Sequence, residues 1–136
     1  MALTFTVLGE PKPQGSKRGF VTKHGKVALV EQAGKPLKNW RDIVTITARH
    51  ERITQQWEPY NEAPMNVTLT FRCKKPLRPK YPVPATRPDI DKLTRAVLDA
   101  LTDAHVWQDD SQVIHLTVTK TYGLPGVDIA IWTNQE

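Results

Sequence analysis

Cysteine is almost absent from this sequence, because Cys73 is the single example among 136 residues. No internal disulfide can form, and Cys73 falls in an alternating apolar segment, where we expect a small core residue. The chain has no run of ~20 apolar residues that would span a membrane, and it begins without the apolar segment of a signal peptide. These absences favour a reducing, cytoplasmic setting and no membrane partner.

Acidic residues are scarce where basic residues gather. Residues 11–41 contain eight Lys or Arg and one acid, Glu31, and residues 72–95 contain eight more with two acids. Residues 99–110 reverse this pattern, with four Asp and no Lys or Arg. This arrangement of the net charge of +5 suits a polyanion bound around a cation-requiring centre. Basic side chains that only solvate the surface are the simpler alternative.

The apolar content of 39% supports one modest core, so we expect a single domain over residues 1–136. Apolar periodicity predicts the order β-α-β-α-β-β, an α+β (mixed α/β) fold in which two main helices pack on a small mixed β-sheet. The expected strands are residues 3–7, 67–73, 114–119 and 127–131, with a short additional strand at 26–30, and the expected helices are residues 36–56 and 91–102. The last two strands are expected to pair as a hairpin. Residues 12–25 and 76–88, rich in Gly or Pro, are expected to be loops.

Two carboxylates, Asp89 and Asp91, stand at the start of the second predicted helix, and Asp109 and Asp110 form a later pair. Phosphodiester hydrolysis needs a neutralised phosphate and an activated water, and two metal ions ~3.5–4 Å apart supply both. Mg²⁺ prefers carboxylates and keeps several waters, so these four aspartates are candidate ligands, with Mn²⁺ as an alternative ion. Each of them alone would equally fit a helix cap or a turn. Asp99 is expected to form a surface pair with the Arg one turn earlier.

Arg95, one turn after Asp91, and Lys92 are candidates to contact the scissile phosphate or to stabilise developing negative charge. A surface ion pair is the alternative for each. Further bases in the predicted loops are candidates to contact the DNA backbone, unless they are only solvated: Lys12, Lys17, Arg18, Lys23, Lys74, Lys75 and Arg87. The four histidines lack metal-ligand spacing, so we expect no zinc site. Trp107 is expected to anchor the loop that carries the second acidic pair.

Two segments resemble the core of the RusA family of Holliday junction resolvases, which runs D-x-D-N-L-x-K, then D-A-L, then W-x-D-D-x-Q-V. In this chain they are P-D-I-D-K-L-T-R-A-V-L-D-A-L at residues 88–101 and V-W-Q-D-D-S-Q-V at residues 106–113. The opening G-E-P-K-P-Q-G-S-K-R, residues 9–18, also resembles the start of phage and prophage members. The resemblance is strongest over residues 87–120.

This resemblance implies a Mg²⁺-dependent endonuclease that acts as a homodimer on four-way DNA junctions, without a small-molecule cofactor, in the cytoplasm of a bacterial or phage-infected cell. It places the catalytic aspartates at Asp89, Asp91 and Asp110, with Asp109 as a neighbour. The family's functional lysine corresponds to Arg95, and its asparagine corresponds to Lys92. Both residues depart from the family pattern. Arginine keeps the positive charge of lysine, but it is bulkier and always protonated.

Resolution of a junction needs two symmetric cuts, and a two-fold dimer presents two equivalent sites. Such an enzyme would recognise junction shape and phosphates more than bases. One alternative is a non-catalytic basic DNA-binding protein whose aspartates are caps and turns. Another is a nuclease of similar chemistry that prefers flaps or other branches.

Overall fold

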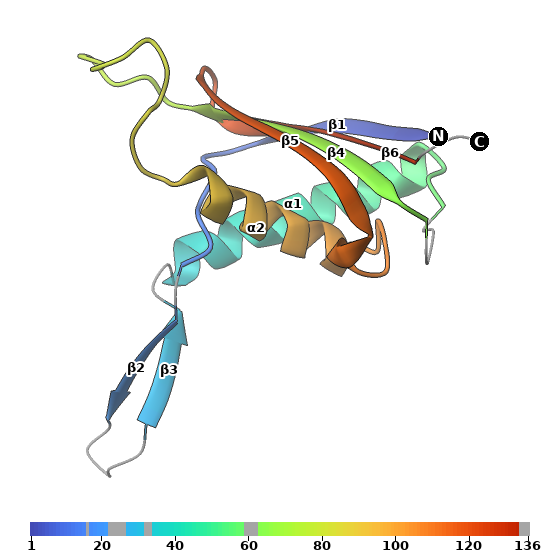
Figure 1. The fold of residues 1–136 in the computed structure, drawn as a ribbon, viewed down its shortest axis with the longest axis horizontal. Coiled ribbons are helices and arrows are strands. Elements are labelled where there is room, and N and C mark those ends of the chain that lie inside the picture. Colours follow the sequence, from blue (N-terminus) through green and yellow to red (C-terminus); the bar gives the residue numbers. More distant parts are fainter. Residues whose placement is uncertain (16, 22–26, 32–33, 59–62, 134–136) are drawn as a thin grey trace.

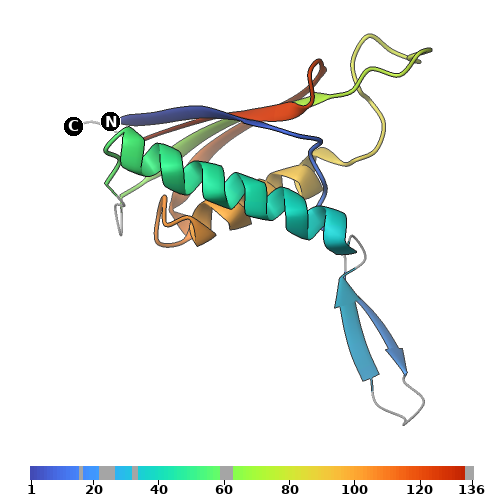
Figure 2. The same cartoon turned by 180° about the vertical axis from the view of Figure 1, so that it is seen from behind.

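The computed structural model of the protein describes residues 1–15, 17–21, 27–31, 34–58 and 63–133. Two helices, α1 (Gly34–Thr54) and α2 (Ile90–Asp103), cover one face of a four-stranded sheet (Figures 1 and 2). A separate two-stranded sheet projects from the region where α1 begins. The strands are β1 (Ala2–Leu8), β2 (Lys17–Val21), β3 (Val27–Glu31), β4 (Met65–Cys73), β5 (Val113–Tyr122) and β6 (Gly126–Thr133), and a short 3-10 helix, η1, covers Asp110–Gln112.

Alternation in the strands of the large sheet produces its core-facing side. In β1, β4 and β6, the side chains that face the helices are buried and apolar, whereas their neighbours along each strand are largely Thr, Asp or Arg, as expected for a sheet covered on one face. The buried strand residues are Leu3, Val7, Met65, Val67, Leu69, Phe71, Val127, Ile129 and Ile131. The predicted α+β class and the order β-α-β-α-β-β of the main sheet and its helices are confirmed.

The predicted hairpin between the last two strands is wrong. The sheet order is β1-β6-β4-β5, so β4 lies between β5 and β6, parallel to the first and antiparallel to the second. The turn from β5 to β6 crosses the end of β4, where Gly123 donates its backbone N–H to the Cys73 carbonyl at 3.0 Å. Arg72 Nε donates to the Leu124 carbonyl at 2.8 Å. These two bonds let a short turn bridge two strand spacings, ~10 Å.

The predicted loop over residues 12–25 is also wrong in part. Residues 17–21 form β2, which pairs antiparallel with β3 from Lys17 opposite Glu31 to Val21 opposite Val27. β-branched and aromatic residues such as Phe20 and Val21 favour an extended strand, and they outweigh the surrounding Gly and Lys. β3 itself confirms the short strand predicted at residues 26–30.

The C-terminal end of α2 is held by arginines of α1. Arg49 Nη2 donates to the Asp103 carbonyl at 3.0 Å, and Arg52 Nε donates to the Ala104 carbonyl at 3.2 Å. Arg41 forms an ion pair with the Asp103 carboxylate at 3.2 Å. Cations at this end satisfy carbonyls that lack a helical partner and complement the helix dipole. The orientation of α2, which carries the first acidic pair, is therefore fixed by α1.

Cys73 does not occupy the core position that the sequence predicts. Its side chain is only half-buried because β4 ends at this residue, and this burial raises the pKa of the thiol. Neither described helix has the length and apolar character that crossing a bilayer requires.

Candidate functional site

The first acidic pair lies at the N-terminus of α2. Asp89 occupies the N-cap position with extended backbone angles, φ −70° and ψ 139°, but its side chain makes no capping hydrogen bond to the described helix. Lys92 Nζ lies 3.6 Å from Asp89 Oδ2, across an exposed i, i+3 pair. Asp91 is exposed in the first helical turn. Neither carboxylate therefore has the capping role that the sequence leaves open.

Lys120 of β5 holds the segment that leads into this pair, and sequence reasoning missed it. Its Nζ donates to the carbonyl of Thr86 at 2.7 Å and to the carbonyl of Pro88 at 2.7 Å. The sequence did contain a signal, because Lys120 lies two residues after Val118 and therefore shares the helix-facing side of β5 with apolar residues. A second contact anchors the first turn of α2, since the Gln14 backbone N–H donates a hydrogen bond to the Lys92 carbonyl at 2.9 Å.

The second acidic pair divides its roles. Asp109 caps η1, since its Oδ2 accepts from Ser111 N at 3.2 Å and its own N–H donates to Gln112 Oε1 at 3.0 Å. Hydrogen bonds from Ser111 lower the pKa of Asp109. Asp110 is exposed beside it. Trp107 is buried and donates its indole N–H to Thr102 Oγ1 at 2.7 Å, which confirms its predicted role as the anchor of this turn.

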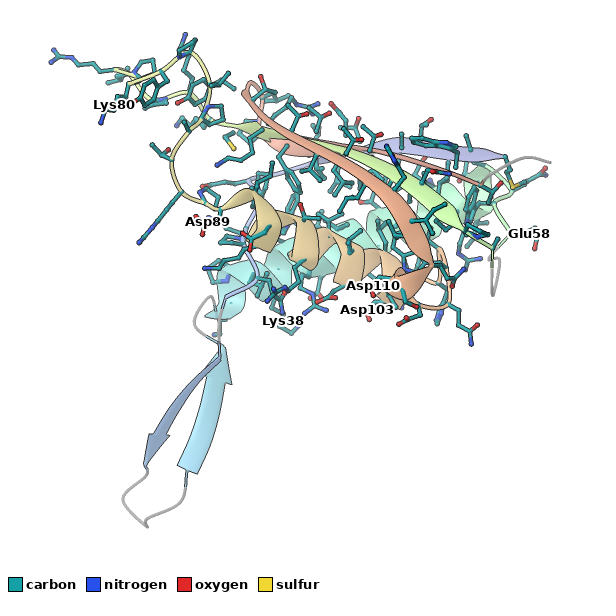
Figure 3. The ribbon with its side chains drawn as sticks, viewed as in Figure 1. Lys38, Glu58, Lys80, Asp89, Asp103 and Asp110 are labelled. Carbon is teal, nitrogen blue, oxygen red and sulfur yellow. The ribbon has the colours of Figure 1, made fainter. Side chains whose placement is uncertain are left out.

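A groove of about 480 Å³ between α2 and β5 brings together Asp91, Arg95 and Asp110. Its walls are mainly apolar: Ile90, Leu98, Leu116 and Val118. A helix rises ~1.5 Å per residue, so the stretch from Asp91 to Leu98 is ~10 Å long. Figure 3 shows Asp110 beside Asp103, at the end of α2 opposite Asp89. Asp110 thus shares this groove with Asp91, whereas Asp89 does not line it.

Asp99 is a further acid near the Asp110 end, and its predicted surface pair with Arg95 is wrong. Burial raises the pKa of Asp99, Arg41 opposes this rise, and the charge of Asp110 adds to it. No ion pair joins Asp99 to Arg95 among the described residues, although Arg95 still lowers the pKa slightly. Asp99 therefore belongs to the acidic environment of Asp110.

A second hollow, about 570 Å³, opens on the other side of the first turn. Asp89 and Lys92 form one wall, Arg87 and Pro88 form the next, and residues 10–15 face them. Lys12 lies there, 3.3 Å from the Glu10 carboxylate. Asp89 and Asp91 consequently open into different hollows, with bases beside the first and apolar walls beside the second.

The chemistry of these side chains fits Mg²⁺, because exposed carboxylates are its preferred protein ligands. Among the described residues, however, no three His, Cys, Asp or Glu side chains are grouped closely enough to hold a metal ion. The described carboxylates of one chain thus form two partial ligand sets, Asp89 in one hollow and Asp91 with Asp110 in the other.

The remaining predicted DNA contacts are distributed around the N-terminal end of α2. Lys74 and Lys75 are exposed directly after β4, and Arg87 is exposed before α2. Lys17 and Arg18 lie in β2, whose backbone alone is described, and Lys23 lies outside the described residues. Those predicted DNA contacts whose side chains are described therefore lie near the Asp89 end of α2 rather than the Asp110 end.

Comparison with known proteins identifies the family. The family model described as "Endodeoxyribonuclease RusA" matches residues 9–132. This chain belongs to the RusA family. A relative from Bacillus subtilis (strain 168), described as "Uncharacterized protein YqaN", is 33% identical over 136 residues, which covers 95% of this chain and 94% of that protein. The resemblance inferred from residues 87–120 is confirmed, and with it the endodeoxyribonuclease class.

Proposed function

We propose that this RusA protein is a Mg²⁺-dependent, structure-selective endodeoxyribonuclease that resolves four-way DNA junctions by paired symmetric cuts. The observation that carries the proposal is the groove in which Asp91 and Asp110 face Arg95, in a chain that belongs to an endodeoxyribonuclease family. A basic protein with pI ≈ 9.5 that leaves these acids exposed has a surface suited to a cation and a polyanion together. It would act in the cytoplasm.

Asp89, Asp91 and Asp110 would hold the metal, with Asp109 as a neighbouring carboxylate. When bound, Mg²⁺ or Mn²⁺ supplies charge neutralisation at the phosphate and an acidified water. The chain's own contribution is orientation: Lys120 fixes the backbone before Asp89, and α1 fixes the far end of α2. Arg95 would face the scissile phosphate, and Lys92 would stay near Asp89.

We further propose a homodimer. β5 is an edge strand of the sheet, and its Ile114 and Leu116 are 61% and 42% exposed. Exposed apolar side chains along a sheet edge form a surface on which another chain can pack. A two-fold partner would supply the second site that symmetric cutting needs. It would also offer a route to a complete ligand set, because the described residues of one chain bring no three such ligands together.

The test is cleavage of a synthetic four-way junction in Mg²⁺ by the wild type and by Asp91→Asn. We expect the wild type to make symmetric nicks and Asp91→Asn to bind the junction without cutting it. Flap and replication-fork substrates in the same buffer separate a junction resolvase from a broader branch nuclease. Wild-type protein that binds junctions with a steep salt dependence, but never nicks them in any divalent metal, would support the non-catalytic DNA-binding alternative instead.

A further inference from the structure

The segment between β4 and α2, residues 74–88, exposes apolar side chains at its tip. We call it the proline loop, because it contains five prolines. Leu77 is 102% exposed, Val83 is 50% exposed and Tyr81 is 49% exposed. Large apolar side chains gathered on one projecting loop are unusual for a surface that meets only water.

The proline loop is built to hold this tip away from the core. Proline fixes φ and leaves few alternative conformations, so little entropy is lost when the loop binds a partner. The base of the loop is tied down, since Lys120 donates to the Thr86 carbonyl at 2.7 Å and Pro84 is buried. Figure 1 shows the loop extending well beyond the end of the sheet. Its apolar tip is therefore presented on a restrained arm.

The charge of the proline loop indicates what it meets. It contains five bases and no acid: Lys74, Lys75, Arg78, Lys80 and Arg87. Lys80 Nζ lies 5.9 Å from the centre of the Tyr81 ring, so charge and aromatic surface are presented together. Two copies of such a loop would repel each other, whereas a polyanion with exposed flat apolar groups would match both features.

Branched DNA offers that combination, because the continuous stack of a duplex is interrupted at a branch point, where base pairs can be opened beside closely spaced phosphates. Paired duplex does not, since its bases are stacked inside. The C-terminal end of the loop runs directly into Asp89, and Figure 3 shows Lys80 of the loop and Asp89 at the same end of the molecule. A loop engaged at a branch point would therefore place phosphates of the same branch near the candidate cleavage site.

We propose that Leu77, Tyr81 and Val83 form an apolar wedge that enters the branch point of the DNA and contacts unstacked bases. This inference rests on the proposed junction-directed function and explains how that function selects its substrate. The flanking bases would bind phosphates of any DNA, and the wedge would supply the preference for a branch. Stacking of one base on an aromatic side chain corresponds to a ~10–100-fold change in affinity.

The test uses a four-way junction with 2-aminopurine at the branch nucleotides, studied in Ca²⁺ to prevent cleavage. We expect wild-type protein to raise the fluorescence as the base unstacks, and the variant Leu77→Ser/Tyr81→Ser/Val83→Ser to lose this rise. Its junction affinity should fall ~10–100-fold while its affinity for linear duplex stays unchanged. The single variant Tyr81→Ala repeats the measurement with a smaller disturbance.

Two controls separate the wedge from general effects. Leu124→Ser changes another exposed leucine, 69% exposed on the β5–β6 turn, and should leave both readouts unchanged. Lys80→Ala should weaken junction and duplex binding equally. Equal loss of junction and duplex binding by the Ser variant would overturn the wedge, and so would a fluorescence rise that survives in it. If the wild-type protein binds phosphatidylserine vesicles through this loop and causes no fluorescence change on junctions, the wedge proposal would be overturned in favour of a lipid surface.

Failure of the proposed nuclease function would look different. Junctions that give the fluorescence rise but are never nicked in Mg²⁺ would leave the wedge in place and remove the catalytic proposal. If the Ser variant nicks junctions with undiminished selectivity, the catalytic proposal stands and the wedge is removed.

Discussion

The two acidic pairs of this RusA protein each begin a helical segment, but their first carboxylates have different structural roles. Asp89 and Asp109 both occupy the N-cap position of a helical segment. Asp109 accepts the capping hydrogen bond and belongs to a reciprocal box with Gln112, whereas Asp89 makes no such bond to its described helix. One N-cap carboxylate is therefore committed to local structure, and the other remains open to a ligand.

The difference follows from what each helix needs. η1 is a three-residue turn with little packing of its own, and none of its residues is buried, so its cap is a main source of order. α2 is held by its apolar face, by arginines of α1 and by Lys120 behind it. A helix that is fixed elsewhere does not depend on its cap, and its N-terminal carboxylates can serve another purpose.

The test with the largest expected effect replaces each of the two N-cap aspartates by alanine. Asp89→Ala should lower junction cleavage by ~100-fold or more, because even partners behind a metal ligand cost ~10–100-fold, and should leave the unfolding temperature nearly unchanged. Asp109→Ala should do the opposite, with a lower unfolding temperature and cleavage that is largely retained. Single-turnover cleavage and thermal unfolding by circular dichroism measure the two effects.

Asp109→Asn is the matched control, because asparagine caps as well as aspartate but carries no charge. It should keep both the unfolding temperature and the cleavage rate. Strong loss of cleavage in this variant, at a temperature where it is folded, would make Asp109 a metal ligand in addition to a cap.

A second test concerns the two bases next to the first pair. Arg95 faces the groove that holds Asp91 and Asp110, while Lys92 lines the other hollow beside Asp89. Arg95→Ala should reduce cleavage of pre-bound junctions by ~100-fold, as for loss of one preorganised donor, and Arg95→Lys should recover much of it. Lys92→Ala should cost only several-fold. The reverse ranking would place the phosphate in the Asp89 hollow.

Much of this structure could be predicted from periodicity, and the errors have physical causes. The helix over residues 90–103 is evident because Leu93, Val97 and Leu101 recur at helical spacing. The sheet order is not, since alternation tells which face of a strand is buried but not which strands are neighbours. A short turn such as the one at Gly123 can equally join adjacent strands or cross the end of β4.

The candidate site was predictable in its residue types and not in its geometry. Acids in a basic chain marked Asp89, Asp91 and Asp110, but spacing along the sequence gave no indication that Asp91 would share a groove with Asp110 while Asp89 opens into another hollow. Nor could composition distinguish an Asp109 that caps its helix from an Asp89 that does not. That distinction depends on side-chain orientation, which tertiary packing decides.

A third test asks whether the open carboxylates depend on the backbone behind them. Lys120→Met keeps the stem and removes both hydrogen bonds to the segment before Asp89. The Mg²⁺ concentration for half-maximal cleavage should rise ~10-fold, the range for partners that orient a metal ligand, with a similar rate at saturating metal. Lys38→Met, which breaks an exposed pair with Asp42 on α1, is the control. A lower rate at every metal concentration would instead assign Lys120 to the phosphate.

The test with the smallest expected effect asks whether the Asp109 cap depends on the charge of its carboxylate. Hydrogen bonds from Ser111 lower its folded-state pKa below the unfolded value of ~3.9. The carboxylate therefore stabilises the fold at pH values above ~3.9, and this contribution is lost as the pH falls through the lowered pKa. The difference in unfolding temperature between wild type and Asp109→Ala should be constant above pH ~5 and shrink toward pH ~2.5. A difference that persists at the lowest pH would mean that the protonated side chain still caps η1, and the contrast with Asp89 would then rest on orientation alone.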